Sequence, residues 1–112
     1  MSQGWIGVDL DGTLAYYDIW RGLDHIGKPI PEMLFNVKNW LAQCKCVKIF
    51  TARASVPECI PIIEEWCLIH IGKKLEVTNV KDFSMIALYD DRAYRIVENT
   101  GKKCCNNYEK II

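Results

Sequence analysis

The sequence predicts a single α/β domain with a mostly parallel sheet and helices on both faces. Three observations lead to this prediction. The chain has 112 residues, a length that suits one domain. Short apolar runs alternate with stretches of helical periodicity, as in strand–helix–strand units. Polar residues directly follow several of the apolar runs, and parallel sheets bind ligands beyond the carboxyl ends of their strands.

Composition excludes several functional classes. Half of the residues are hydrophobic and 25% are charged, as in soluble globular proteins. The formal net charge is zero, so the chain lacks the strong basic field of a dedicated nucleic-acid binder. The N-terminus has no signal-peptide pattern, and no apolar stretch has the length of a membrane span. We therefore expect a cytoplasmic protein without a membrane partner.

The six cysteines are expected to be reduced, because the chain has no secretory signal. Two close pairs, Cys44/Cys46 and Cys104/Cys105, raise the alternative of a zinc site. Neither pair has the Cys-x2-Cys spacing common in structural zinc sites. We therefore expect structural or incidental thiols rather than zinc ligands.

The first predicted strand, Ile6 to Val8, ends in two carboxylates. Asp9 and Asp11 are spaced i, i+2, so in extended backbone they project to the same side of the strand end. Gly12 then makes a sharp exit from the strand. Two carboxylates in one place need a cation, or need pKa values that differ enough for one to attack while the other carries protons.

Two alternatives for this stretch involve no catalysis. Asp and Gly favour turns, so the stretch also fits a plain strand-to-turn transition. A calcium loop starting at Asp9 would need glycine at its sixth position and glutamate at its twelfth. Those positions hold Leu14 and Trp20, which excludes the calcium loop.

Residues 15–31 show no helical period and are predicted to form a short flap over the end of the first strand. The flap contains three aromatic residues, Tyr16, Tyr17 and Trp20. We interpret them as packing within the flap rather than as a surface that meets a ligand. His25 is interpreted as a loop residue rather than a metal ligand.

Two helices are predicted around the second strand. The first begins at Pro31, and the strand covers Cys46–Phe50. Residues 55–58 have the form of a capping box, and the helix that follows is expected to reach about His70. Pro61 lies inside that predicted helix, where it would produce a kink.

The last third of the chain is predicted to contain two more strands, a helix and an edge strand. The strands cover residues 75–78 and 85–89, and the second of them is apolar enough to be buried. A helix is expected from about Ala93 to Asn99. A final short edge strand is assigned to Cys104 and Cys105.

The predicted sheet gathers several polar side chains beyond the carboxyl ends of its strands. These are Asp9 and Asp11 after the first strand, Thr51 after the second, Lys81 shortly after the third, and Asp90 and Asp91 after the fourth. Four carboxylates near each other repel unless a cation holds them. A hard divalent ion with oxygen ligands, Mg²⁺ first, is the simplest solution.

These motifs resemble the haloacid dehalogenase (HAD) superfamily of phosphotransferases. The resemblance rests on the series Asp9-x-Asp-Gly-Thr-Leu, Phe50-Thr51, a lysine, and Asp90-Asp91. The longer segments 48–53, 77–82 and 90–93 resemble the corresponding sequences of short stand-alone HAD-like proteins of bacteria and phages. The resemblance implies one HAD-like hydrolase domain over residues 1–112. It also implies a Rossmann-like three-layer sandwich with strand order 5-4-1-2-3.

The resemblance also implies roles for individual residues. Asp9 would be the nucleophile that forms an aspartyl-phosphate, and Asp11 would be the general acid and base. Lys81 would stabilise negative charge, and Thr51, also a catalytic residue, would hold the transferring phosphoryl group. Substrate-binding positions would be Gly12, Thr13, Thr51, Ala52 and Arg53, although a surface position is an equal alternative for Arg53. The Mg²⁺ ligands, with Mn²⁺ as a possible substitute, would be Asp9, Asp11, Asp90 and Asp91.

The flap at residues 15–31 is too short for the cap domain that covers the site in many HAD relatives. We therefore expect an open site, or one covered by a second subunit of a homo-oligomer. The expected substrate is a nucleotide, a sugar phosphate or a phosphorylated nucleic-acid end. The main rival is a binding or regulatory module that retains only the metal site. A receiver domain and a nuclease-type metal fold fit less well, because their acidic residues lie elsewhere in the chain.

Overall fold

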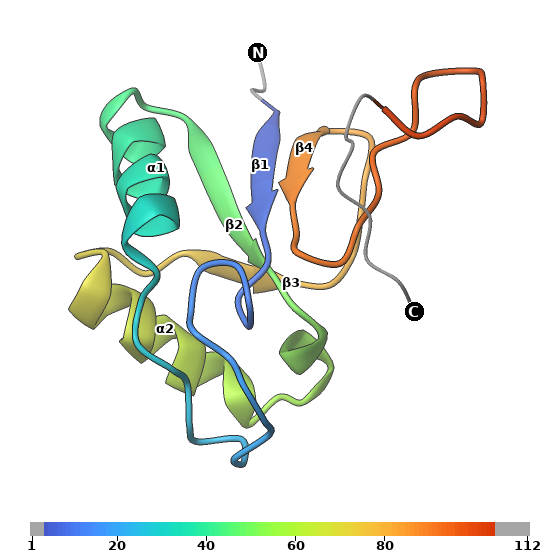
Figure 1. The fold of residues 1–112 in the computed structure, drawn as a ribbon. Helices are drawn as coiled ribbons and strands as arrows, with labels where there is room; N and C mark the ends of the chain where they lie inside the picture. The colour runs from blue at the N-terminus through green and yellow to red at the C-terminus, as the bar shows by residue number, and fades with distance from the viewer. Residues whose placement is uncertain (1–3, 105–112) are drawn as a thin grey trace.

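The computed structural model describes residues 4–104 of the chain (Figure 1). Their secondary structure alternates between strands and helices, as the sequence predicts. The elements are β1 (Trp5–Val8), α1 (Pro31–Ala42), β2 (Cys46–Phe50), the 3₁₀-helix η1 (Ala52–Ser55), α2 (Cys59–His70), β3 (Glu76–Thr78) and β4 (Met85–Tyr89). The predicted α/β class is confirmed.

The sheet has four parallel strands in the order β3-β2-β1-β4. This differs from the predicted order 5-4-1-2-3. The four strands keep the relative order 4-1-2-3, but the described residues contain no fifth strand in the sheet. Of the two residues assigned to that strand, Cys105 lies outside the described part of the chain. Lys103 instead forms an isolated antiparallel bridge with Ile96.

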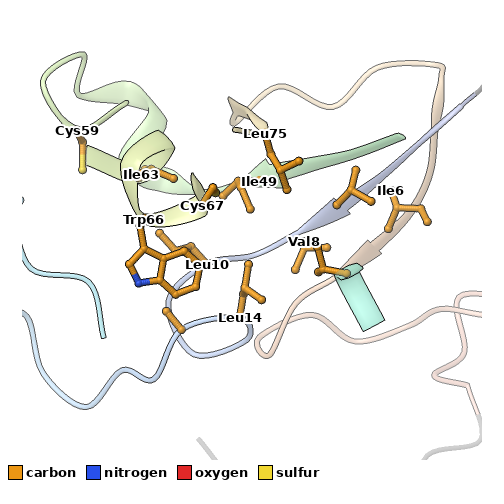
Figure 2. Packing of buried hydrophobic residues seen from close by; sticks show 13 residues of the cluster. Ile6, Val8, Leu10, Leu14, Ile49, Cys59, Ile63, Trp66, Cys67 and Leu75 are labelled. Carbon is orange, nitrogen blue, oxygen red and sulfur yellow. The ribbon is translucent and has the colours of Figure 1, made fainter. Parts of the chain in front are cut away.

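Both α-helices cover the same face of the sheet, so the prediction of helices on both faces is wrong for residues 4–104. In a single core, the sheet residues Val8 and Ile49 pack with Ile63 of α2 (Figure 2). Val37 of α1 belongs to the same core. The steps from β1 to β2 and from β2 to β3 run in one direction across the sheet. Right-handed crossovers then place both helices on one side.

The connection from β3 to β4 carries no helix to cover the opposite face. Residues 79–84 are too few for a helical crossover, which ordinarily takes a dozen or more. The connection is held to that face by Trp5, whose indole N–H donates to Asp82 Oδ1 over 2.9 Å. Lys48 lies over the same indole, with its Nζ 4.5 Å from the ring centroid.

The predicted helix at residues 93–99 is absent, and a hairpin occupies this part of the chain. Val97 N donates to Lys102 O, and Cys104 N donates to Arg95 O, each over 2.8 Å. The turn between them contains Asn99 with φ 64°. Asn and Gly favour turns of this kind, and the run Asn-Thr-Gly at 99–101 therefore ends any helix before it can propagate.

The start of α2 also differs from its prediction. Ser55 belongs to η1, and its hydroxyl donates to Ala52 O instead of capping the next helix. Because α2 begins at Cys59, Pro61 lies in its first turn. The backbone nitrogens of the first turn have no partner within the helix, so proline costs no hydrogen bond there. This placement removes the reason for the predicted kink.

The cysteines divide between the core and the surface. Cys59 and Cys67 are buried, Cys44 and Cys46 are exposed, and all four are free thiols. Cys104 is disulfide-bonded, so the expectation of reduced thiols does not hold for it. Within residues 4–104, no cysteine belongs to a group of side chains spaced to hold a metal ion. No helix in this range is long and apolar enough to cross a membrane.

Candidate active site

A tight loop after β1 carries the two carboxylates predicted from the sequence. Leu14 N and Ala15 N both donate to Leu10 O, over 3.0 and 2.8 Å. Leu10 and Leu14 are fully buried in the core, which anchors the loop (Figure 2). Because buried residues precede and follow Asp11 in the sequence, the loop between them has little conformational freedom. The core therefore fixes the position from which Asp9 and Asp11 project.

Gly12 allows this loop to approach the end of β4. Its φ is +90°, a conformation that side chains rarely adopt. A Cβ atom at this position would lie 2.7 Å from Asp91 Oδ2. Glycine is therefore required by both the backbone angle and the nearby carboxylate.

Three carboxylates meet where β1 and β4 end. Asp9, Asp90 and Asp91 each offer one oxygen, and these oxygens lie within 4.8 Å of one another. Hard divalent cations prefer oxygen ligands, and Mg²⁺ ordinarily combines a few carboxylates with waters, so the donor set fits Mg²⁺ or Mn²⁺. The side chain of Asp11 does not belong to this group among the described residues.

Thr13 links the loop after β1 to the end of β4. Its hydroxyl lies 3.3 Å from Asp9 Oδ2 and 3.1 Å from Asp91 Oδ1, and it can donate to either oxygen. The same hydroxyl accepts a hydrogen bond from Asp91 N over 3.0 Å. Thr13, predicted to bind substrate, thus organises the carboxylates in this structure.

The protonation of Asp9 reflects its crowded surroundings. The pKa of Asp9 is raised to about 7, first by burial, then by the hydrogen bond with Asp91 and by the charges of Asp90 and Asp91. The Thr13 hydrogen bond acts the opposite way and lowers this pKa. A cation among the three carboxylates would relieve the repulsion and favour the ionised form of Asp9.

Asp11 faces a different partner. Arg53 Nε donates to Asp11 Oδ2 over 2.8 Å, and Arg53 Nη2 donates to Asp11 Oδ1 over 3.0 Å. This is a bidentate ion pair, the geometry in which arginine recognises a carboxylate most specifically. Burial alone would lower the pKa of the Arg53 guanidinium, but its hydrogen bonds with Asp11 raise it above the ordinary value.

Arg53 also connects this ion pair to the flap at residues 15–31. Its guanidinium donates to the carbonyl oxygens of Leu23 and His25, over 3.2 and 3.0 Å. Only 6% of Arg53 is exposed, so the surface alternative for this residue is wrong. Arg53 reaches Asp11 because η1 turns the chain back directly after β2.

Thr51 is buried at the carboxyl end of β2. Its backbone N–H donates to Thr78 O on β3 over 2.9 Å, which keeps the strand end in register. Its hydroxyl oxygen accepts a hydrogen bond from Arg53 N over 3.2 Å. The hydroxyl hydrogen is then available to another acceptor in the cleft.

One cleft of about 670 Å³ contains most of the predicted site residues. It is lined by Asp9, Asp11, Tyr17, Trp20, Phe50, Thr51, Ala52, Arg53, Asp90, Asp91 and Arg92. Its volume lies within the range of roughly 300–1,000 Å³ typical of small-molecule sites. Polar groups from three strand ends therefore share a space large enough for a metabolite-sized ligand.

Gly12 and Thr13, both predicted to bind substrate, do not line the cleft, and neither does the predicted catalytic Lys81. Lys81 lies after β3, as expected, but its side chain is exposed. Lys73 and Lys74 precede β3 and line a separate cavity with Leu75 and Glu76, at the opposite end of the strand. The basic side chains that line the cleft within residues 4–104 are Arg53 and Arg92.

Sequence reasoning missed Arg92 and misjudged two aromatic residues. Arg92 directly follows Asp91, and this adjacency was the available signal. Tyr17 and Trp20 were assigned to packing within the flap, but they are 43% and 53% exposed and line the cleft. No sequence pattern separates a packed aromatic residue from an exposed one in a segment without periodicity.

Comparisons with known proteins support the fold and leave the family open. No protein-family model matches the chain, and no curated protein matches it. One solved structure, described as that of a conserved protein from Bacteroides thetaiotaomicron, is similar to it. The two share 21% sequence identity with a TM-score of 0.58, over 82% of this chain and 78% of the other. At this identity the similarity concerns the fold alone.

Proposed function

We propose that this protein is a Mg²⁺-dependent phosphomonoesterase of the HAD type that works through an aspartyl-phosphate on Asp9. One observation carries the proposal. Asp9 and Asp11 come from the same loop and line the same cleft, yet Asp9 lies among carboxylates while Asp11 pairs with Arg53. Two carboxylates in different environments suit the two different tasks of nucleophile and proton carrier.

Asp9, Asp90 and Asp91 would hold the metal ion, with the Asp11 backbone carbonyl as a further ligand implied by the resemblance. When bound, the ion supplies positive charge that offsets the carboxylates and the phosphate. Asp9 is then ionised, and one of its oxygens attacks phosphorus while the bond to the leaving oxygen breaks. In its protonated form, Asp11 gives its proton to that leaving oxygen and becomes a carboxylate. It later takes a proton from the water that releases phosphate from Asp9.

Arg53 constrains how Asp11 performs this role. Both Asp11 oxygens accept hydrogen bonds from Arg53, so proton transfer requires one of these bonds to be exchanged for the substrate oxygen. In return, the rigid guanidinium keeps the carboxylate in one orientation. We therefore assign Arg53 as a positioning residue for Asp11.

The transferring phosphoryl group would lie against Thr51 and the backbone N–H groups near Ala52. Thr51 contributes a buried hydroxyl there, and Gly12 leaves room beside Asp91. Lys81 remains the proposed source of positive charge, and its exposed side chain must extend into the cleft to act. Arg92 already lines the cleft and is the alternative source.

A binding or regulatory module is the second candidate. It is favoured by one observation, the occupation of both Asp11 oxygens by Arg53, which withholds the proton carrier from a substrate. Such a module would bind Mg²⁺ at the three carboxylates but would not turn over phosphomonoesters.

Hydrolysis of p-nitrophenyl phosphate separates the two candidates. The enzyme should release p-nitrophenolate with Mg²⁺ or Mn²⁺ and should stop when EDTA is added. Mg²⁺ binding by calorimetry without turnover of any phosphomonoester would support the module instead. Full activity in exhaustively chelated protein would remove the metal from the proposal.

The proposal also covers the fold type, the cellular location and the oligomeric state. The parallel sheet is compatible with a Rossmann-like arrangement, which we propose on the strength of the HAD resemblance. A cytoplasmic location is proposed from the composition. A homo-oligomer that covers the cleft is a further proposal, tested by light scattering.

A further inference from the structure

Two aromatic side chains stand exposed in the wall of the proposed catalytic cleft. Tyr17 is 43% exposed and Trp20 is 53% exposed, and both line the cleft that contains Asp9 and Asp11. Exposing large aromatic surfaces costs free energy that burial would recover. A position beside a phosphate-sized polar site makes a ligand surface the better explanation.

Trp20 is held in place by the residue that orients Asp11. The guanidinium carbon of Arg53 lies 4.9 Å from the centroid of the Trp20 ring, within the range of a cation–π contact. Arg53 itself is fixed by its bidentate pair with Asp11. Through Arg53, the Trp20 indole is held in a fixed position relative to Asp11. The exposed part of the indole is the part that Arg53 does not cover.

The flap that carries both aromatics is tied to the body of the domain. Tyr16 N donates to Lys28 O over 2.8 Å, which joins the two arms of the flap. The indole N–H of Trp66 on α2 donates to Gly27 O over 3.0 Å. Because the flap is anchored, a ligand that stacks on it would pay little of the entropy needed to order a mobile loop.

We propose that Tyr17 and Trp20 form a stacking platform for the nucleobase of a phosphomonoester substrate whose phosphate lies at Asp9. This inference rests on the proposed function and names its substrate class. A nucleobase is planar and stacks on aromatic side chains without regard to sequence. Of the three substrate classes expected from the sequence, sugar phosphates lack such a plane.

Two sources carry this chemistry, a free nucleotide and a phosphorylated nucleic-acid end. Both place a base one sugar away from a phosphomonoester. The zero net charge provides no general attraction for a nucleic-acid backbone. The experiment therefore includes both sources, and activity on either is compatible with the platform.

The test compares substrates that share ribose and phosphate and differ in the base. AMP and a short 5′-phosphorylated oligonucleotide carry the base, whereas ribose 5-phosphate does not. We expect kcat/KM for at least one of the first two to exceed that for ribose 5-phosphate by about tenfold or more, within the contribution that base stacking makes. Trp20→Ala and Tyr17→Ala should each reduce that ratio, and Trp20→Phe should retain most of it.

Tyr16→Ala is the matched control. Tyr16 is also an exposed flap aromatic. It lines an adjoining cavity that shares Asp11, Tyr17 and Arg53 with the cleft, but Tyr16 itself does not line the cleft, so its loss should leave the ratio unchanged. Equal kcat/KM for ribose 5-phosphate and both base-containing substrates would overturn the platform while leaving the phosphatase intact. So would an unchanged ratio in the Trp20→Ala and Tyr17→Ala variants.

A binding measurement keeps the two proposals distinguishable. Calorimetry with the Asp9→Asn variant compares AMP with ribose 5-phosphate without turnover. Tighter AMP binding that is lost in Asp9→Asn/Trp20→Ala supports the platform even if no substrate is hydrolysed. Equal binding of the two ligands overturns it. Absence of turnover with every phosphomonoester counts only against the proposed function.

Discussion

Arg53 donates to both carboxylate oxygens of Asp11, although the two residues are 42 positions apart in the sequence. The pair couples three parts of the proposed site. Asp11 belongs to the loop after β1, Arg53 belongs to η1 after β2, and the same guanidinium binds carbonyls of the flap. A change at Arg53 should therefore affect proton transfer without removing any group that contacts phosphorus.

Arg53→Lys should lower kcat by about tenfold or more, because a lysine cannot reproduce the bidentate pair or bind both flap carbonyls. If Arg53 positions the base that activates water, the phosphoryl-enzyme should also persist longer in rapid-quench experiments. Arg21→Lys is the control, since Arg21 forms an exposed pair with Asp18 and such pairs contribute little. Equal kinetics in the two variants would remove the positioning role.

Asp9→Asn and Asp11→Asn should fail in different ways. Asp9→Asn has no nucleophile, so no phosphoryl group should attach to it. Asp11→Asn keeps the nucleophile, and with p-nitrophenyl phosphate the leaving group needs little protonation. Asp11→Asn should therefore accumulate an enzyme one phosphoryl group heavier by mass spectrometry, with the group on Asp9. Normal turnover by Asp9→Asn would leave Asp9 with a metal-binding role only.

The stability of the metal-free protein should fall as pH rises from about 4 to about 7. The ordinary pKa of an aspartate is 3.8, and that of Asp9 is about 7 in the folded protein, so the folded state binds a proton that the unfolded state has lost. That contribution is fully present below the unfolded pKa and disappears as pH rises through the folded pKa. Urea denaturation across this range measures it.

The same linkage predicts how Mg²⁺ acts. Mg²⁺ binding requires ionised Asp9, so Mg²⁺ should raise the melting temperature more at pH 8 than at pH 5. In Asp9→Asn, the fall in metal-free stability between pH 4 and pH 7 should be much smaller. A Mg²⁺ effect that is equal at both pH values would contradict the assignment of Asp9 as a ligand.

Gly12→Ala should reduce both stability and Mg²⁺ affinity. The positive φ should cost roughly 1–2 kcal/mol for a residue with a Cβ. The new Cβ would also press on Asp91 Oδ2 and displace a proposed ligand. Gly72→Ala is the matched control, because Gly72 has φ +92° but nothing within 4 Å of its Cβ position. It should lose stability alone, as measured by urea denaturation and by calorimetric titration with Mg²⁺.

Lys81→Ala should lower kcat by about 10²-fold if Lys81 supplies the charge that stabilises the transition state. The double variant Lys73→Ala/Lys74→Ala should behave like the parent, since both side chains line a cavity at the start of β3. Steady-state kinetics of Arg92→Ala complete the comparison. A large loss in Arg92→Ala together with normal kinetics in Lys81→Ala would transfer the role to Arg92.

The sequence predicted the location of those site residues that directly follow a strand. Parallel strands bring their carboxyl ends to one edge, so Asp9, Thr51 and Asp90 were placed near each other from their positions after apolar runs. The sequence also predicted the boundaries of β2 and β4 and the start of α1 at Pro31 correctly. These boundaries depend on the length of an apolar run and on the position of a proline, which are local features that do not require knowledge of tertiary contacts.

Other features depended on contacts that no local pattern encodes. The Arg53–Asp11 pair requires η1 to turn the chain back, and the sequence offered no reason to prefer it over a surface arginine. The hairpin at residues 95–104 was mistaken for a helix because a short polar segment carries little periodicity. The helices lie on one side of the sheet because β1, β2 and β3 follow one another in one direction, and the short β3–β4 connection leaves no helix for the opposite face.

The Thr13–Asp91 contact has a consequence for how the protein folds. It joins residues 78 positions apart, and β1 lies between β2 and β4 in the sheet. Closing so long a loop costs entropy before the contact returns any free energy, which slows folding. During synthesis, a ribosome that has released residues 1–80 has produced three strands and both helices, but only one of the three clustered carboxylates. The proposed metal site would therefore form only after β4 has been added to the sheet, and Mg²⁺ would not assist the folding steps that precede it.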